Sequence, residues 1–383
     1  MTANDGELSR LVDELNRSRA ASHDGAPSLD AILTRAARLN ASDILLVAGS
    51  AAALRVRGKL GATFGKPLSS ENLRGMLLPL LSPAQSADLE RNRSIDFCFL
   101  RGSIGRFRAN FHYQRGALAA SLRWLPAQIP TLESLNLPPL LAQLTERRQG
   151  LVLITGPTGC GKSSTLAALI DLVNGRRHEH IVTIEDPIEF HHPNRSSLVE
   201  QLEVGRDTPG FAQAVRAVLR QNQDVILVGE MRDSETMAAA LTAAETGHLV
   251  FSSMHTNDCA QTVSRILDIF PAGHLSQIRQ QFSLALLAIV SQQLAPGADG
   301  TIRYPAVEIL MATAAVRNLI RSGQDHQIRS HIATGRAEGM MTMEQSLADL
   351  VRSGRILRET AFAHCYHAAE LGQHLASAPT TPA

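Results

Sequence analysis

Residues 156–163 read Gly-Pro-Thr-Gly-Cys-Gly-Lys-Ser, which is the phosphate-binding pattern G-x-x-x-x-G-K-[ST]. Glycines let several backbone N–H groups converge on one anion, and the helix that follows points its positive dipole end at the same place. Lys162 is expected to reach the β- and γ-phosphates of a nucleotide, and the Ser163 hydroxyl is expected to ligate Mg²⁺. The sequence therefore predicts a site for ATP and Mg²⁺. Its expected binding residues are Gly156, Pro157, Thr158, Gly159, Cys160, Gly161, Lys162, Ser163 and Ser164.

The lysine in this loop is unusual for the chain, which has 37 lysine and arginine residues but only three lysines, Lys59, Lys66 and Lys162. A compact ammonium group fits between phosphate oxygens, whereas a planar guanidinium fits there poorly. Lysine at position 162, in a chain that otherwise uses arginine, indicates that the chemistry of this position requires it.

Two predicted strand ends offer carboxylates that could act on a bound nucleotide. The apolar run 181–184 leads into Glu185, and the apolar run 225–228 leads into Gly229 and Glu230. Because the carboxyl ends of parallel strands meet at one edge of a sheet, we expect both acids to project toward the phosphate-binding loop. A single acid after a strand is usually a solvated loop charge, but two in one phosphate-binding domain favour a chemical role.

These acids have distinct predicted roles in nucleotide hydrolysis. Glu230 is expected to activate the attacking water, and Glu185 is the second candidate catalytic carboxylate. Mg²⁺ is expected to bind the Ser163 hydroxyl and water, with Glu185 or Asp186, and Glu230, as candidate ligands. His255 follows the next predicted strand, where a histidine could sense a γ-phosphate and relay a conformational change. A histidine held by structural hydrogen bonds is the alternative interpretation.

The elements that must position these residues change in character near residue 150. Before it, strands follow one another with helices at one end, which predicts a small α+β domain with an antiparallel sheet. After it, apolar strands alternate with helices, which predicts a parallel sheet buried on both faces. The expected strands are 43–47, 53–56, 94–100, 105–114, 118–125, 151–155, 181–185, 225–228 and 249–252. The expected helices are one from residue 29, 71–89, one from 162, 211–221 and 234–246, with mainly helices from there to about 371.

Composition shifts divide the chain into five predicted parts. These are a flexible extension 1–28 with a short amphipathic helix over 8–15, an α+β domain 29–125, a proline-rich linker 126–139, an ATPase domain 140–371 and a flexible tail 372–383.

The overall composition excludes several classes of protein. A net charge of +1 and 4% aromatic residues argue against a nucleic-acid partner. The four cysteines are far apart in the sequence, so neither a structural zinc site nor a disulfide framework is indicated. The polar N-terminus is unlike a signal peptide, and the longest apolar stretch, near 282–290, is far shorter than the ~20 residues that span a bilayer. We therefore expect a cytoplasmic protein with no membrane insertion.

Taken together, the motifs resemble the secretion ATPase family, most closely its pilus-retraction (PilT-type) branch, over roughly residues 29–370. The matching segments are the Walker A loop 156–163, the Asp box 183–190 (Thr-Ile-Glu-Asp-Pro-Ile-Glu-Phe), the Walker B segment 224–233 and the His box 246–256. The segment 315–321 (Ala-Val-Arg-Asn-Leu-Ile-Arg) resembles a motif of the retraction branch. The tetracysteine module usual in the assembly and type II secretion branches cannot form from these cysteines.

The resemblance implies a RecA-like P-loop NTPase C-terminal domain with a smaller α+β, PAS-like N-terminal domain. It also implies an ATP-hydrolysing homo-hexamer that powers type IV pilus retraction, or twitching motility, by coupling ATP binding and hydrolysis to inter-domain motion. Such a ring is expected at the pilus base, peripheral to the inner membrane and against a platform protein. In the family, arginines of the N-terminal domain approach the γ-phosphate, and the matching positions are Arg106, Arg108 and Arg123.

The sequence departs from the family at positions that do not touch the predicted chemistry. Gln223 replaces a usual proline before the Walker B segment, and Leu45 replaces a usual histidine. Three alternatives to a retraction motor stay open: a pilus-assembly or type II secretion ATPase, a nucleic-acid-translocating RecA-like motor, and a non-hydrolysing subunit of the same ring.

Overall fold

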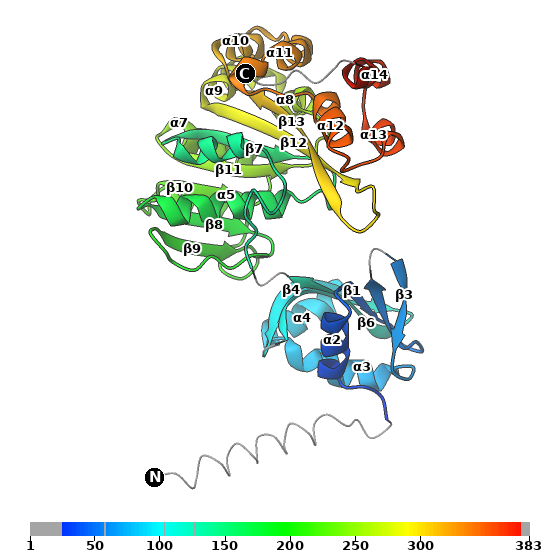
Figure 1. The fold of residues 1–383 in the computed structure, drawn as a ribbon. Coiled ribbons are helices and arrows are strands. Elements are labelled where there is room, and N and C mark those ends of the chain that lie inside the picture. Colours follow the sequence, from blue (N-terminus) through cyan, green and yellow to red (C-terminus); the bar gives the residue numbers. More distant parts are fainter. Residues whose placement is uncertain (1–24, 57–58, 103, 126–127, 377–383) are drawn as a thin grey trace, which may run out of the picture. The chain divides into compact units, whose positions relative to one another are not determined.

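The computed structural model describes residues 25–56, 59–102, 104–125 and 128–376. The chain divides into two compact units, one up to residue 127 and one from residue 128 (Figure 1). The amphipathic helix predicted over 8–15 lies outside the described residues. Within the described part of the chain, no helix is both long and apolar enough to cross a bilayer.

The described residues of the first unit form a six-stranded antiparallel sheet and three α-helices. Its elements are α2 (Leu29–Arg38), β1 (Ala41–Leu46), β2 (Ala52–Val56), β3 (Lys59–Phe64), α3 (Ser70–Leu77), α4 (Pro83–Asn92), β4 (Ser94–Arg101), β5 (Gly105–Gln114) and β6 (Ala117–Leu125). The strand order is β3-β2-β1-β6-β5-β4, and every neighbouring pair is antiparallel. This confirms the predicted α+β class with an antiparallel sheet.

Apolar and polar side chains alternate along the strands of the first unit, so one face of its sheet is packed against helices and the other is polar. Ile44 of β1 lies opposite Leu122 of β6, and both are buried with apolar residues of α2, α3 and α4. The next pair, Asp43 and Arg123, points to the other face because successive strand residues alternate. The helix predicted over 71–89 is in fact two helices, because Ser82 begins a new capping box for α4.

The second unit contains a seven-stranded sheet. Its strands are β7 (Gly150–Thr155), β8 (His180–Glu185), β9 (Leu198–Glu203), β10 (Val225–Val228), β11 (Leu249–Met254), β12 (Leu286–Pro296) and β13 (Arg303–Met311). The order is β13-β12-β7-β11-β10-β8-β9, with only β13 antiparallel to its neighbour. The strand that leads into the phosphate-binding loop, β7, therefore lies between β11 and β12.

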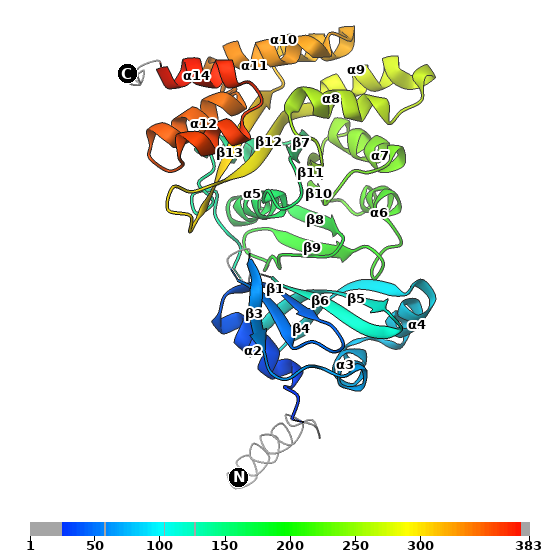
Figure 2. The same cartoon turned by 90° about the vertical axis from the view of Figure 1, so that its right-hand side faces the viewer.

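Helices cover both faces of this sheet (Figure 2). One face carries α5 (Lys162–Arg176) and the 3-10 helix Pro139–Glu146. The other face carries α6 (Phe211–Val218), α7 (Ser234–Glu245), α8 (Cys259–Asp268), α9 (Leu275–Ala285), α10 (Ala314–Ser322) and α11 (Ile328–Thr334). A smaller core joins the β12–β13 hairpin to α12 (Met343–Arg352), α13 (Arg358–His364) and α14 (Ala368–Ala376). The buried parallel strands β7, β8, β10 and β11 confirm the predicted α/β class.

The structure corrects three expectations for the second unit. The segment after 252 is not mainly helical, because β12 and β13 form a long antiparallel hairpin there. The apolar run 284–290 has no hydrophobic periodicity, so its pattern cannot distinguish a buried strand from a buried helix. The chain changes from α9 to β12 within this run. The strand β9 was also not predicted. Residues 372–376, which were expected to belong to a flexible tail, are part of α14.

A loop after β8 buries a histidine that is neutral in the folded protein. His192 is 8% exposed, and its Nδ1 has no hydrogen-bond partner among the described residues. Burial, helped by the positive charge of Arg195 and by His191, lowers the pKa of His192 from 6.5 to about 4. Between these two values the unfolded chain binds a proton at this ring and the folded chain does not.

We predict that His192 makes the second unit acid-sensitive. The free energy of unfolding should fall by up to about 3 kcal/mol as the pH drops from about 6.5 toward 4. Denaturant unfolding at pH 7.5 and pH 5 should show a smaller pH-dependent loss in His192→Gln than in the wild-type chain. His274→Gln, at an exposed position of the same unit, is the matched control. An equal loss in His192→Gln and wild type would contradict the prediction.

Candidate nucleotide site

The phosphate-binding loop has the backbone geometry that its glycines predict. It connects the end of β7 to the start of α5, and Gly156, Gly159 and Gly161 have φ values of 137°, 80° and 93°. L-residues with side chains rarely adopt this region. A Cβ at Gly156 would also lie 2.2 Å from the carbonyl oxygen of Gln292, so the loop is packed directly against β12. The backbone N–H groups at the start of α5 face the position where an anion binds in such loops.

The remaining loop residues differ in exposure. Pro157, Thr158 and Ser163 are exposed, Ser164 is partly buried, and the Cys160 side chain is buried against the loop. Burial raises the pKa of the Cys160 thiol. A buried, protonated thiol agrees with Cys160 as a small packing residue of the loop.

Lys162 is held inside the loop by backbone carbonyls. Its Nζ donates to the carbonyl oxygens of Gly156 at 2.8 Å and Pro157 at 3.2 Å. Its Nζ also lies 3.3 Å from Nδ1 of His255, which comes from the loop after β11. Burial lowers the pKa of Lys162, and the nearby Cys160 and Glu230 act in the opposite direction. The ammonium group is therefore positioned by neutral acceptors and by one imidazole.

The predicted chemical residues Lys162, His255 and Glu230 are brought together in one chain of contacts. A protonated lysine can only donate, so Nδ1 of His255 accepts and its Nε2 carries the proton. Nε2 lies 3.2 Å from Oε1 of Glu230, and an Arg232 guanidinium nitrogen donates to Oε2 at 2.8 Å. Burial alone would raise the pKa of Glu230, but the contacts with Arg232 and His255 outweigh it, and the net pKa is lowered. Glu230 is thus ionised and oriented, as a general base requires.

Glu185 occupies the adjacent strand end but has different partners. β8 and β10 pair in register up to Ile184 and Val228, which places Glu185 and Glu230 at the same edge of the sheet. Oε1 of Glu185 accepts hydrogen bonds from Thr183 at 2.7 Å and Gln201 at 3.1 Å. Burial raises the pKa of Glu185, and these hydrogen bonds oppose the shift. Its surroundings favour a protonated carboxyl more than those of Glu230 do.

The oxygen donors at this edge suit Mg²⁺, which also takes ligands from water and phosphate, better than a metal ion bound entirely by protein side chains. Across the described ranges, no three His, Cys, Asp or Glu side chains converge to hold a metal ion. Mg²⁺ is usually bound by one or two protein oxygens, substrate phosphates and water. The exposed Ser163 hydroxyl beside Lys162 and the ionised Glu230 are oxygen donors of that kind, whereas Glu185 already accepts from Thr183 and Gln201 and its pKa is raised.

The three arginines predicted to approach a γ-phosphate lie in the first unit and share one face of its sheet. Arg108 on β5 pairs in register with Arg123 on β6, and Arg106 lies two residues away on the same side. Arg123 donates to Asp43 Oδ1 at 3.0 Å, and Asp43 also lies 3.4 Å from Arg55. Asp43 therefore neutralises part of the charge that Arg123 would otherwise offer to a phosphate.

Sequence reasoning missed Gln292, a residue that contacts the phosphate-binding loop directly. It is 2% exposed on β12, and its Nε2 donates to the carbonyl oxygen of Cys160 at 2.6 Å. The hydroxyl of Thr165, in the first turn of α5, donates to its Oε1 at 2.9 Å. The available signal was the run of three polar residues, 291–293, within an otherwise apolar strand.

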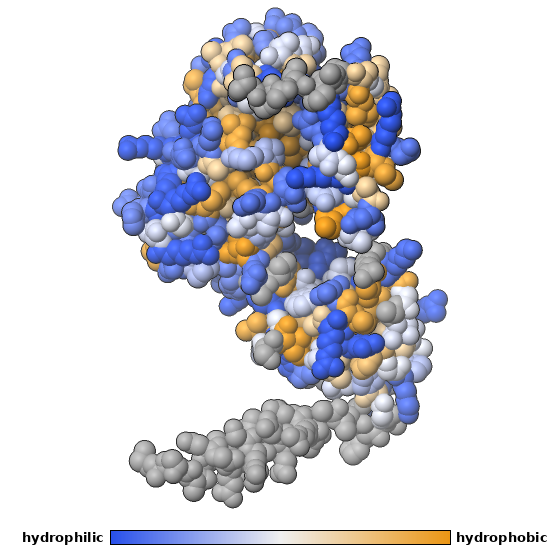
Figure 3. Space-filling view, in the orientation of Figure 1, coloured by the Kyte–Doolittle hydropathy of each residue, from blue (hydrophilic) through white to orange (hydrophobic). Residues whose placement is uncertain are grey.

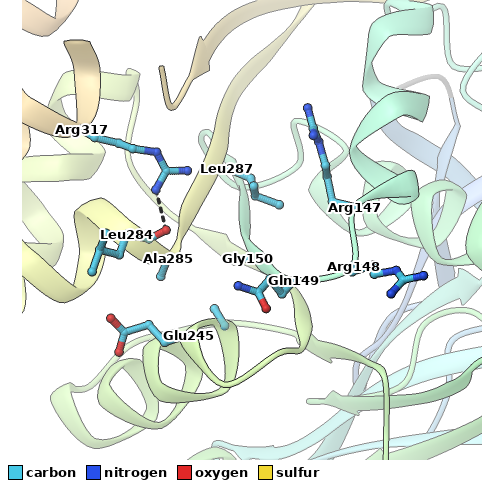
Figure 4. A pocket seen from close by; sticks show the side chains of 10 residues that line it. Arg147, Arg148, Gln149, Gly150, Glu245, Leu284, Ala285, Leu287 and Arg317 are labelled. Atoms are coloured by element: carbon cyan, nitrogen blue, oxygen red, sulfur yellow. Dashed lines mark hydrogen bonds between the residues drawn. The ribbon is translucent and has the colours of Figure 1, made fainter. Parts of the chain in front are cut away.

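A cavity of about 560 Å³ lies at the opposite edge of the sheet, where β7 begins (Figure 4). The side chains of Arg147 and Arg148 point away from each other there, so they do not converge on one ligand. Arg317 instead donates to the carbonyl oxygens of Ser283, Leu284, Leu286 and Ala312. This residue, from the segment 315–321, fixes the turn from α9 into β12.

Comparisons with known proteins identify a family and several similar proteins. The family described as Type II/IV secretion system protein matches residues 130–371. The chain is 46% identical over 309 residues to a twitching motility protein of Neisseria gonorrhoeae, covering 80% of this chain and 82% of that protein. It is 43% identical over 331 residues to the type IV pilus retractation ATPase PilT of Pseudomonas aeruginosa, covering 86% and 96%. A crystal structure of the pilus retraction motor PilT with bound ADP matches with a TM-score of 0.83 at 43% identity, covering 90% of this chain and 99% of that one.

We predict that Lys162→Arg abolishes productive nucleotide binding although arginine keeps the charge. The side chain is 9% exposed and its ammonium fits between two backbone carbonyls, so a planar guanidinium has no room to do the same. The kcat/KM for ATP should fall at least about a hundredfold, or about 3 kcal/mol. Lys66→Arg, at an exposed position of the first unit, is the matched control and should retain wild-type activity. Wild-type kcat/KM in Lys162→Arg would refute the assignment.

Proposed function

The chain belongs to the type II/IV secretion system protein family, and we propose that it is an ATP-hydrolysing motor that retracts type IV pili. The observation that carries the proposal is the contact chain from Lys162 through His255 to Glu230, which joins a phosphate-binding lysine to an ionised carboxylate. The relatives named for twitching motility and pilus retraction match most of the chain and support the choice of machine.

The residues divide the hydrolysis of ATP between binding and proton transfer. The loop 156–161 and the N-terminus of α5 bind the phosphates, and Lys162 turns its ammonium from the backbone carbonyls toward their oxygens. Glu230 accepts the proton of the attacking water, whose oxygen forms the new bond to the γ-phosphorus as the bond to ADP breaks. The Ser163 hydroxyl would hold Mg²⁺, which when bound would supply neutralisation of the phosphate charge.

His255 contacts both the phosphate-binding lysine and the carboxylate that accepts the proton. Its Nδ1 contacts Lys162 and its Nε2 contacts Glu230, so movement of Lys162 toward a phosphate removes one of its two partners. The resulting change in the His255 loop is the proposed signal that a γ-phosphate is bound. Arg106, Arg108 and Arg123 are proposed to stabilise the transferred phosphoryl group, and Arg123 must then exchange its bond to Asp43 for one to phosphate.

At the level of assembly, we propose a homo-hexamer in the cytoplasm that acts at the base of the pilus, peripheral to the inner membrane. ATP binding and hydrolysis would move the two units of each chain relative to each other. The ring would pass that motion to a platform protein of the pilus base.

The chemical part of the proposal is tested by Glu230→Gln. The amide keeps the size of the carboxylate but cannot accept the proton, so kcat should fall by about 100- to 10,000-fold while ATP binding persists. ATP turnover and fluorescent ADP binding measure the two quantities separately. Glu235→Gln, on the exposed surface of α7, is the matched control. Unchanged turnover in Glu230→Gln would favour a non-hydrolysing subunit, and stimulation of wild-type turnover by DNA would favour a nucleic-acid motor.

The biological part is tested by deleting the gene and imaging pili in the organism that encodes this chain. Loss of a retraction motor should give cells with excess pili that no longer retract and no twitching. Complementation with the wild-type chain should restore retraction, whereas complementation with Glu230→Gln should not. Cells without pili after deletion would refute the proposal in favour of an assembly ATPase.

A further inference from the structure

Three consecutive polar residues in β12 contact three different parts of the second unit. The strand is otherwise mainly apolar. Ser291 pairs with Thr155 at the end of β7, and Gln292 and Gln293 follow it. Buried polar side chains are costly unless they are hydrogen-bonded, so their partners identify what they position. Neither the proposed hydrolysis nor the motifs account for these residues.

Gln292 fixes the phosphate-binding loop relative to α5. The carbonyl of Cys160 can only accept, so the amide nitrogen of Gln292 must face it, and the amide oxygen then accepts from Thr165. One side chain thereby connects the loop to the first turn of the helix. A Cβ at Gly161 would lie 3.2 Å from the same amide nitrogen, so the contact is close.

Ser291 fixes the loop that carries His255. Its buried hydroxyl donates to the carbonyl oxygen of Asn257 at 2.6 Å, two residues beyond His255. The same carbonyl oxygen accepts a second hydrogen bond, at 2.8 Å, from the hydroxyl of Tyr366. Tyr366 lies between α13 and α14, which Figure 1 labels. This single carbonyl therefore joins the loop after β11 to the C-terminal helices.

Gln293 completes the connection on the helical side. Its amide nitrogen donates to the Tyr366 hydroxyl, and its amide oxygen lies 3.3 Å from Nδ1 of His364 at the end of α13. The backbone N–H groups of Tyr366 and His367 donate to Oε1 of Glu344, a residue of α12 that is 1% exposed. Tyr366 is thus held at both its backbone and its hydroxyl.

We propose that Ser291, Gln292 and Gln293 couple the nucleotide site to helices α13 and α14, with Gln292 as a positioning residue of the phosphate-binding loop and Tyr366 as the link to the helices. The inference rests on the proposed nucleotide binding and goes beyond it, because it assigns the route by which a bound nucleotide alters a distant surface. A change in the His255 loop moves the Asn257 carbonyl, and the helices follow through Tyr366. By thermodynamic linkage, a partner bound to these helices changes nucleotide affinity in return.

The coupling is tested by hydrogen–deuterium exchange of the full-length chain with and without a non-hydrolysable ATP analogue, which supplies the γ-phosphate. The analogue should change the exchange of backbone amides in 358–376 in the wild type, although these residues are not in the phosphate-binding loop. Tyr366→Phe keeps the ring and removes the hydroxyl, so this analogue-dependent change should be lost. Tyr304→Phe, on β13, is the matched control and should retain it. A wild-type chain that binds the analogue without a change in 358–376, or a change that persists in Tyr366→Phe, would overturn the coupling.

The positioning role is tested by ADP affinity in Gln292→Glu. Glutamate has the same shape and keeps the acceptor for Thr165, but it loses the donor to the Cys160 carbonyl. We expect the Kd for ADP to rise by about tenfold. An unchanged Kd would overturn the positioning role. If this variant does not fold, as judged by its melting temperature, Tyr366→Phe still decides the coupling, because its partly exposed side chain loses only one oxygen atom. Failure of the wild-type chain to bind ADP would instead refute the proposed function itself.

Discussion

The buried ammonium group of Lys162 is the charge around which the nucleotide site is organised. Because Nζ can only donate, every group around it must accept, and the carbonyls of Gly156 and Pro157 and Nδ1 of His255 do so. This choice fixes the tautomer of His255, whose Nε2 then donates to Glu230. The protonation of one lysine therefore determines the orientation of a carboxylate two strands away. A His255 tautomer with its proton on Nδ1 would face the Lys162 ammonium with a second donor and would leave Glu230 without its imidazole donor.

Strand order explains why these groups can meet. The phosphate-binding loop follows β7, which lies between β11 and β12, so His255 approaches it from one side and Gln292 from the other. Glu230 follows β10, one strand further from the loop, and His255 forms the chain of contacts between it and Lys162. The glycines permit this approach, because a side chain at Gly156 would collide with the backbone of β12. The conformation of the loop therefore depends on its packing against β12 as much as on its own glycines.

Residues with a fixed local pattern could be predicted from the sequence, and those defined by long-range packing could not. The glycines, Lys162 and the acids after β8 and β10 follow from spacing and from the geometry of parallel strands. The β12–β13 hairpin could not be predicted, because an apolar run without periodicity suits a buried helix as well as a strand. Gln292 was missed for a related reason: its partner Cys160 is 132 positions away, and the amide has no local signature. Likewise Asp43 is 80 positions from Arg123, so the ion pair that restrains that arginine is visible only in the fold.

The two groups that donate to Glu230 hold its carboxylate in one orientation but also reduce its basicity. A carboxylate has about four acceptor positions, so the single bonds from His255 and Arg232 leave positions on both oxygens for a water molecule. The two donors hold the carboxylate in one orientation, which favours attack by a positioned water. They also lower its pKa, and a weaker base removes a proton less readily. The Arg232 side chain is 71% exposed, so its bond is the easier of the two to exchange with solvent. Loss of the Arg232 bond would therefore raise the pKa of Glu230, while the imidazole that Lys162 holds in place would still orient the carboxylate.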